Sequence, residues 1–274
     1  MRYQRIEPSR GWAACGLNLR ELWDFRDLLL QLAQRDLKLR YKQTLLGVTW
    51  VILQPLVASL VFAVVFGRVA RLPSEGLPYL LFVYTGLLPW SFVAASVQRA
   101  GSSLIADSRL IARVYFPRML IPFASLGAVL VDFAIAGLVM LVLLFAYRVP
   151  LTPNLLALPL LIGLMLLIAT GVSLGLSALT VYYRDFVHMT PFLLQVWMYA
   201  SPLVYSASMV PEEWRLLYGL NPMAGLIDGF RWSLLASGSF PAPAVALAGL
   251  VGALLLLFNA TLFRRVERAF ADVI

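Results

Sequence analysis

Residues with acid–base, nucleophilic or metal-binding chemistry are scarce in this chain of 274 residues. It contains one histidine, His188, and one cysteine, Cys15, which argues against a histidine-based triad, a metal centre and an internal disulfide. The only lysines are Lys38 and Lys42, and neither follows the glycine-rich loop that cradles nucleotide phosphates. We therefore expect no catalytic residue, no metal and no nucleotide hydrolysis in this chain.

One acidic residue stands out because of its position. Asp132 is the only carboxylate in the middle of an apolar stretch, and an ionised acid inside a membrane is costly unless it faces a bundle interior or a partner group. Two interpretations are open: Asp132 takes part in transport, or it pairs with a polar group or an arginine of a neighbouring helix and fixes packing. A secondary transporter driven by protons or sodium would usually need more than one such acid.

The elements that hold these residues are expected to be membrane helices. Hydrophobic residues make up 61% of the chain and charged residues 13%, which is typical of a polytopic membrane protein. Taking about 20 apolar residues as the length that crosses a bilayer, we predict an all-α fold with six transmembrane helices. The predicted spans are 44–67, 77–98, 119–147, and stretches within 154–181, 189–206 and 243–263.

Basic residues predict the orientation. The net charge of +8 comes mostly from arginines spread around the apolar stretches, which favours membrane topology over a nucleic-acid surface. Most of them fall in the amino-terminal segment, between the second and third spans, and in the carboxyl-terminal tail. The positive-inside rule assigns this side to the cytoplasm, so both termini are expected there. The amino-terminal start lacks the apolar core of a secretory signal.

The segment before the first span is amphipathic. Polar side chains recur every three or four positions between residues 20 and 42, while Leu22, Phe25, Leu29 and Leu32 keep the same spacing on another face. From residue 44 to residue 67 there is no charge at all. This pattern predicts a helix on the membrane surface that leads directly into a spanning helix.

The connection 105–116 lies between two long spans and has helix signals of its own. Asp107 and Ser108 are candidate caps, and Arg109 and Arg113 are four positions apart. The segment forms either a helix presented to a cytoplasmic partner or a solvated turn.

The connection 211–240 contains an apolar run that is too short to cross a bilayer, followed by Asp228 and Arg231. It forms either two half-helices that dip into the outer leaflet, buried against protein, or a periplasmic loop with one surface helix.

Three separated stretches carry a resemblance to a known family: RDLKLRYKQTLLGVTWVILQP at 35–55, YYRDFVHMTPFLLQVWMYASPLVY at 182–205 and LNPMAGLIDGFRW at 220–232. Together they resemble the ABC-2 type permeases that export polysaccharides. The resemblance is closest to the O-antigen and lipid-linked glycan exporters, with capsule and teichoic acid exporters as near relatives. It covers nearly the whole chain, with the motifs in the right order.

The resemblance implies a half-transporter that forms a homodimer and docks onto two copies of a separate ABC ATPase, which binds ATP and magnesium. The chain itself would hold no cofactor and bind no nucleic acid. Residues 1–43 would be a cytoplasmic segment with an interfacial helix over 18–43, residues 44–263 the transmembrane domain and residues 264–274 a cytoplasmic tail. A coupling helix within 105–116 would contact the ATPase, and a re-entrant pair over 211–235 would form a periplasmic gate.

The resemblance also implies roles for individual residues. The substrate conduit would draw on Trp50, Phe62, Phe66, Trp197, Tyr199 and Tyr205. The entrance for the lipid headgroup would use Arg35, Arg40 and Arg184, although pairing with Asp36 and Asp185, or with lipid phosphate, is equally compatible with these positions. Coupling to the ATPase would involve Asp107, Ser108, Arg109, Arg113 and Tyr115, and the periplasmic gate Asn221, Pro222, Asp228 and Arg231.

The function that follows is ATP-driven export of a polyprenyl-pyrophosphate-linked polysaccharide, such as O-antigen, across the bacterial inner membrane. One alternative is an ABC-2 exporter of small hydrophobic drugs. Another is a membrane-embedded glycan enzyme, and the lack of clustered carboxylates or a metal motif counts against it.

Overall fold

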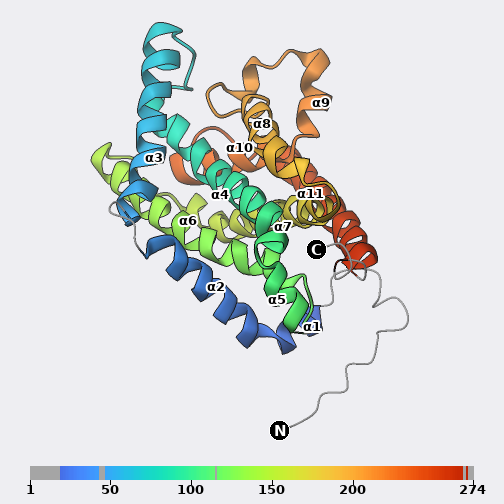
Figure 1. Ribbon diagram of the computed structural model, residues 1–274. Helices are drawn as coiled ribbons and strands as arrows, with labels where there is room; N and C mark the ends of the chain where they lie inside the picture. Colours follow the sequence, from blue (N-terminus) through green and yellow to red (C-terminus); the bar gives the residue numbers. More distant parts are fainter. Residues whose placement is uncertain (1–18, 43–46, 115, 268–269, 271–274) are drawn as a thin grey trace.

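The computed structural model describes residues 19–42, 47–114, 116–267 and 270, and these residues form helices joined by loops, without a strand (Figure 1). Within these described residues, five helical segments are long and apolar enough to cross a membrane. They are α3 with its π-helical continuation η2 (Gly47–Phe62 and Ala63–Val69), α4 (Tyr79–Ala106), α6 (Leu120–Ala146), η3 with α7 (Pro153–Ala157 and Leu158–Tyr182) and α11 (Ala242–Val266).

The helix predicted as the fifth span is shorter than the other five. α8 (Asp185–Tyr199) has 15 residues, which corresponds to about 22 Å along its axis. The hydrocarbon core of a bilayer is about 30 Å thick. The helix ends shortly before Pro202, since a proline lacks an amide donor and disfavours helical backbone at the residue before it.

Short helices fill the connections. α1 (Leu19–Asp24) and α2 (Arg26–Tyr41) form the predicted amino-terminal helix, with a break at Phe25; its predicted ends, Asn18 and Gln43, lie outside the described residues. The connection before α6 contains α5 (Ser108–Arg113). The connection between α8 and α11 contains η4 (Ala207–Met209), η5 (Glu212–Trp214), α9 (Arg215–Gly219) and α10 (Pro222–Leu235).

α4 forms the centre of the bundle and packs against α3, α6, α7, α8 and α10. Its residues Leu81 to Leu88 are buried on every side of the helix, as expected for a helix surrounded by protein. α7 and α11 approach closely because α7 has glycines at the contact: a Cβ on Gly175 would lie 2.6 Å from the side chain of Asn259. The Asn259 amide donates to the Gly171 carbonyl at 2.9 Å, which adds a polar contact of the kind that holds membrane helices together.

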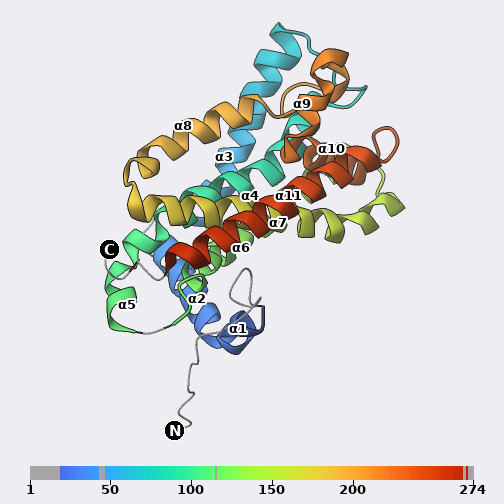
Figure 2. The same cartoon turned by 90° about the vertical axis from the view of Figure 1, so that its right-hand side faces the viewer.

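The bundle has two distinct ends, which are visible in both orientations (Figures 1 and 2). The α5 end carries α1, α5 and the start of α2. The α9 end carries α9, the loop after η2 and the segment that leads from α8 to α10. α2 runs from the α5 end along α6, and its Leu32 is buried there.

Candidate functional site

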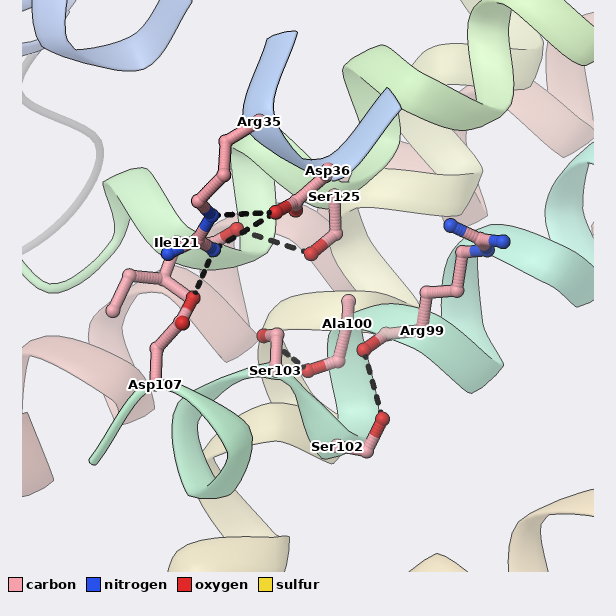
Figure 3. A network of polar contacts seen from close by, with 9 residues as sticks. All are labelled: Arg35, Asp36, Arg99, Ala100, Ser102, Ser103, Asp107, Ile121 and Ser125. Atoms are coloured by element: carbon pink, nitrogen blue, oxygen red, sulfur yellow. Dashed lines mark hydrogen bonds and ion pairs between the residues drawn. The ribbon is translucent and has the colours of Figure 1, made fainter. Parts of the chain in front are cut away.

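An ion-pair network joins α2 to the junction between α4 and α5 (Figure 3). The Arg35 Nη2 atom donates to the Asp107 Oδ2 atom at 2.6 Å and to the Asp36 Oδ1 atom at 2.8 Å. The hydrogen bond with Asp107 is the main reason that the pKa of Arg35 is raised above its ordinary value, against the opposing effect of burial. Because Arg35 and Asp107 are 72 positions apart, this contact is a tertiary link between the amino-terminal helix and α5.

Asp107 does not cap α5 in the way that the sequence pattern suggests. It occupies the N-cap position, but its side chain makes no capping hydrogen bond, because its carboxylate is engaged with Arg35. α5 is anchored by buried Ile111, which belongs to a core cluster with Leu32 of α2 and Leu104 of α4. Of the two interpretations of residues 105–116, the helix is present.

The other residues predicted for coupling lie on α5 or just beyond it. Arg109 and Arg113 are exposed, and Ser108 is the first residue of the helix. Tyr115 lies outside the described residues. The α5 end therefore presents a short helix with two accessible arginines.

Asp132 is 8% exposed and forms an ion pair with Arg40 and accepts a hydrogen bond from the Tyr41 hydroxyl. Both partners lie at the end of α2, so the carboxylate holds this end against the middle of α6. This geometry matches the packing interpretation, in which the acid pairs with an arginine of a neighbouring helix. The pKa of Arg40 is lowered from its ordinary value, first by burial and then by the positive charge of Arg99.

Asn221 organises the entrance to α10 at the α9 end. Its Oδ1 atom accepts hydrogen bonds from the Trp197 Nε1 atom at 2.9 Å and from the Met223 amide at 3.1 Å, so it caps α10. Its Nδ2 atom donates to the Ala200 carbonyl at 3.1 Å and to the Ser201 hydroxyl at 3.0 Å. Pro222 follows at the first position of α10, where its missing amide donor costs nothing. One side chain thus fixes the start of α10 to the end of α8.

Arg231 is a buried arginine among the predicted gate residues, with 3% exposure. It lies 3.6 Å from Asp228, donates to the Leu203 carbonyl at 2.9 Å, and its guanidinium lies 3.6 Å from the centre of the Phe82 ring. The ring face of Phe82 supplies a further favourable contact for the charge. Arg231 therefore joins α10 to α4 and to the segment after α8.

The aromatic residues predicted for the conduit do not form one surface in the single chain. Trp197 and Tyr205 line a cavity of about 700 Å³ at the α9 end, together with Trp214, Tyr218 and Leu255. Phe62 and Phe66 pack against each other at 5.9 Å between ring centres. Trp50 and Tyr199 are exposed, at 54% and 60%.

The arginines predicted for the lipid headgroup entrance fall into two kinds. Arg35 and Arg40 are engaged with carboxylates, as described above. Arg184 is exposed at the N-cap position of α8.

Sequence reasoning gave no individual site role to Arg99, Tyr41, Trp214 and Tyr218. Arg99 was missed because the predicted second span stops at residue 98, whereas α4 continues as a helix to Ala106. The signal that could have found it is its isolation, since it is the only charged residue of α4. Among the described residues, no group of three or more His, Cys, Asp and Glu side chains has the arrangement of a metal site.

Comparison with known proteins adds independent information. Residues 27–235 match the family model of ABC-2 type transporters. The chain is 33% identical to the O-antigen export system permease protein RfbA of Myxococcus xanthus over 93% of this chain and 98% of the relative. It is 28% identical to RfbA of Klebsiella pneumoniae, over 90% and 95%, and 22% identical to the polysialic acid transport protein KpsM of Escherichia coli, over 71% and 76%.

Proposed function

The chain belongs to the ABC-2 type transporter family, and we propose that it is the permease subunit of an ATP-driven exporter of a polyprenyl-pyrophosphate-linked polysaccharide such as O-antigen. It is a transport subunit and not an enzyme. The observation that carries the proposal is the end-to-end similarity to permeases named for O-antigen export. ATP and magnesium are bound by a partner ATPase, and the chain works as a homodimer with two ATPase copies in the bacterial inner membrane.

In this proposal six spans place both termini in the cytoplasm. α8 supplies the span missing from the five long helices and is the fifth in chain order, completed by the turn from Ala200 to Ser206, and the α5 end is cytoplasmic. α9 and α10 form the re-entrant pair at the periplasmic side. The domain boundaries at residues 43 and 263 then separate an interfacial segment, a membrane domain and a short tail.

Coupling begins at α5. The exposed Arg109 and Arg113 contact the ATPase, and a displacement of α5 reaches α2 through the Asp107–Arg35 ion pair. ATP binding can shift the permease between two conformations only if the ATPase binds these two conformations with different affinities. The position of α5 must therefore differ between the two conformations of the permease.

Export ends at the α9 end. Asn221, Asp228 and Arg231 hold the gate segment, and release of these contacts opens a path for the glycan. Aromatic rings suit the CH faces of sugars, and the conduit residues Trp50, Phe62, Phe66, Trp197, Tyr199 and Tyr205 supply them when two copies come together.

Deletion of this chain tests the proposal. Cells that lack it should accumulate lipid-linked glycan in the cytoplasm and lose it from the surface, and expression of the intact chain should restore surface glycan. Unchanged surface glycan after deletion would contradict the proposal.

A second candidate is export of small hydrophobic compounds, because the cavity at the α9 end is lined largely by apolar and aromatic side chains. ATPase activity of the reconstituted complex separates the two candidates. Stimulation by hydrophobic drugs but not by lipid-linked glycan would favour the second.

A further inference from the structure

Arg99 is the one charged residue on α4, the helix at the centre of the bundle. It lies seven residues before Ala106, the last residue of the helix, which is about 10 Å along the axis from the α5 end of α4. Its side chain is half-buried. A guanidinium at this depth needs an anion or hydrogen-bond acceptors to offset the loss of water.

The carboxylates around Arg99 are already engaged with other arginines. Asp36 and Asp107 both bind Arg35, and Asp132 binds Arg40. Within the described part of the chain, the Arg99 guanidinium forms no ion pair and no hydrogen bond. Figure 3 shows the guanidinium extending away from the group of Arg35, Asp36 and Asp107; the dashed line at Arg99 joins its backbone carbonyl to the Ser102 hydroxyl, and none reaches the guanidinium. Arg99 is therefore available for an anion from outside the chain.

The Arg99 guanidinium itself fits a phosphate. Arg40 is close enough for the charge of Arg99 to lower the pKa of Arg40, but the Asp132 carboxylate already pairs with Arg40, and the nearby Asp36 carboxylate binds Arg35. Arg99 therefore supplies the unpaired positive charge, and the planar fork of its guanidinium matches the oxygens of a phosphate group. Arg99 lies about two turns inside the end of a spanning helix, so its long side chain can extend toward the lipid headgroups at the α5 end.

We propose that Arg99 on α4, beside Arg40 of α2, binds the phosphate group of a membrane lipid at the α5 end of the bundle. This inference rests on the proposed function for the assignment of that end to the cytoplasm. The phosphate belongs either to a polyprenyl diphosphate carrier or to an ordinary phospholipid. Arg99 is thus the headgroup-binding residue, whereas Arg35 and Arg40 are held by carboxylates.

Binding to the intact complex tests this inference. The chain and its ATPase are purified together in nanodiscs of phosphatidylcholine, and the affinities for farnesyl diphosphate, for phosphatidylglycerol and for inorganic pyrophosphate are measured. Arg99→Gln should weaken binding of at least one of the two lipids by tenfold or more. Arg148→Gln removes an exposed arginine just beyond the carboxyl-terminal end of α6, away from the α5 end. This control variant should change the affinity for either lipid by less than twofold.

The pattern across the ligands identifies the source of the phosphate. If Arg99→Gln weakens only the binding of farnesyl diphosphate, the phosphate belongs to the polyprenyl carrier. If it weakens the binding of phosphatidylglycerol, the phosphate belongs to a phospholipid. Equal lipid affinities for the wild type and Arg99→Gln would overturn the inference, as would a loss confined to inorganic pyrophosphate. If Arg99→Gln does not assemble, Arg99→Lys gives the same readout, because it keeps the charge and loses the fork. An unchanged affinity for both lipids in Arg99→Lys would then overturn the inference.

The binding assay is independent of transport. A chain that binds lipid through Arg99 but whose deletion leaves glycan export intact would overturn the proposed function and keep this inference. If the chain is required for export but Arg99→Gln binds both lipids as well as the wild type does, the proposed function stands and the inference about Arg99 is overturned.

Discussion

The two ends of the bundle are held together by different chemistry. At the α5 end, α2 is bound to its neighbours by arginine–carboxylate pairs, with Arg35 to Asp107 and Arg40 to Asp132. At the α9 end, the contacts of Asn221 are hydrogen bonds between uncharged groups, and the Asp228–Arg231 pair is longer, at 3.6 Å. The first set links elements that are far apart in the sequence. In the second set, Asn221 attaches the start of α10 to the end of α8, and Asp228 and Arg231 pair within α10.

This difference suggests a division of labour. Charge-assisted hydrogen bonds are about twice as strong as neutral ones, and removing one partner leaves a costly buried charge. Such contacts suit elements that must move together, as α5 and α2 do in the proposed coupling. Neutral hydrogen bonds contribute about 1 kcal/mol each and separate more easily. They suit a segment that must open, as the proposed gate does.

The largest effect is expected at Asp132. Asp132→Asn leaves Arg40 half-buried without its counter-charge, and breaking a buried pair in this way costs about 3–5 kcal/mol. The unfolding temperature of the purified protein should fall accordingly. The double variant Asp132→Asn with Arg40→Gln should recover most of the loss, because it removes both charges. Equal stability of the single and double variants would break the distinction between the two ends.

A large effect on function is expected at the Asp107–Arg35 link. Asp107→Asn removes the carboxylate that binds Arg35 but leaves α5 anchored by Ile111, so the protein should assemble with its ATPase and export glycan at least tenfold more slowly. Surface glycan and ATPase activity are measured together. Normal ATPase activity with lost export indicates uncoupling. Export at the wild-type rate would show that α5 does not act through α2.

A moderate effect is expected at Asn221. Asn221→Ala removes the cap of α10 and the contacts to Trp197, Ala200 and Ser201, at a cost of about 1–2 kcal/mol. Hydrogen exchange of the backbone from residue 200 to residue 223 should become faster. Asn154→Ala is a matched control at the same end, since the Asn154 side chain makes a single longer contact with the Trp232 carbonyl, at 3.3 Å. Equal protection from hydrogen exchange in Asn221→Ala and Asn154→Ala would mean that Asn221 does not hold residues 200–223 in place.

The sequence predicted the helices that depend on local composition. The third predicted span, 119–147, differs from α6 by one residue at each end, because an apolar run of that length ends where polar residues begin. The end of the second span was missed for the opposite reason. Arg99 stopped the predicted span, but a helix continues through a charge when its other faces are packed, as α4 does to Ala106.

The sequence could not predict which charges pair. Asp132 was recognised as costly, and pairing with a polar group or an arginine of a neighbouring helix was one of two open interpretations, but its partners Arg40 and Tyr41 are some 90 positions away. They meet only because α2 packs along α6, where a Cβ on Gly127 would lie 3.1 Å from the Cβ of Ala33. Likewise, Asp107 has the sequence pattern of a helix cap, and only the position of Arg35 shows that its carboxylate is used elsewhere.

The smallest effect is expected at an exposed ion pair of the α9 end. Arg215 lies 3.2 Å from Glu212, but the two side chains are 57% and 86% exposed, and pairs of this kind contribute within about 0.5 kcal/mol. Glu212→Gln should therefore leave the unfolding temperature and surface glycan unchanged within error, while Asp107→Asn lowers export. The two variants remove one carboxylate each from an arginine partner, so they differ mainly in burial and in which elements they join. A loss of export in Glu212→Gln as large as that in Asp107→Asn would show that charge at either end controls transport, and the division between a coupled end and an opening end would fail.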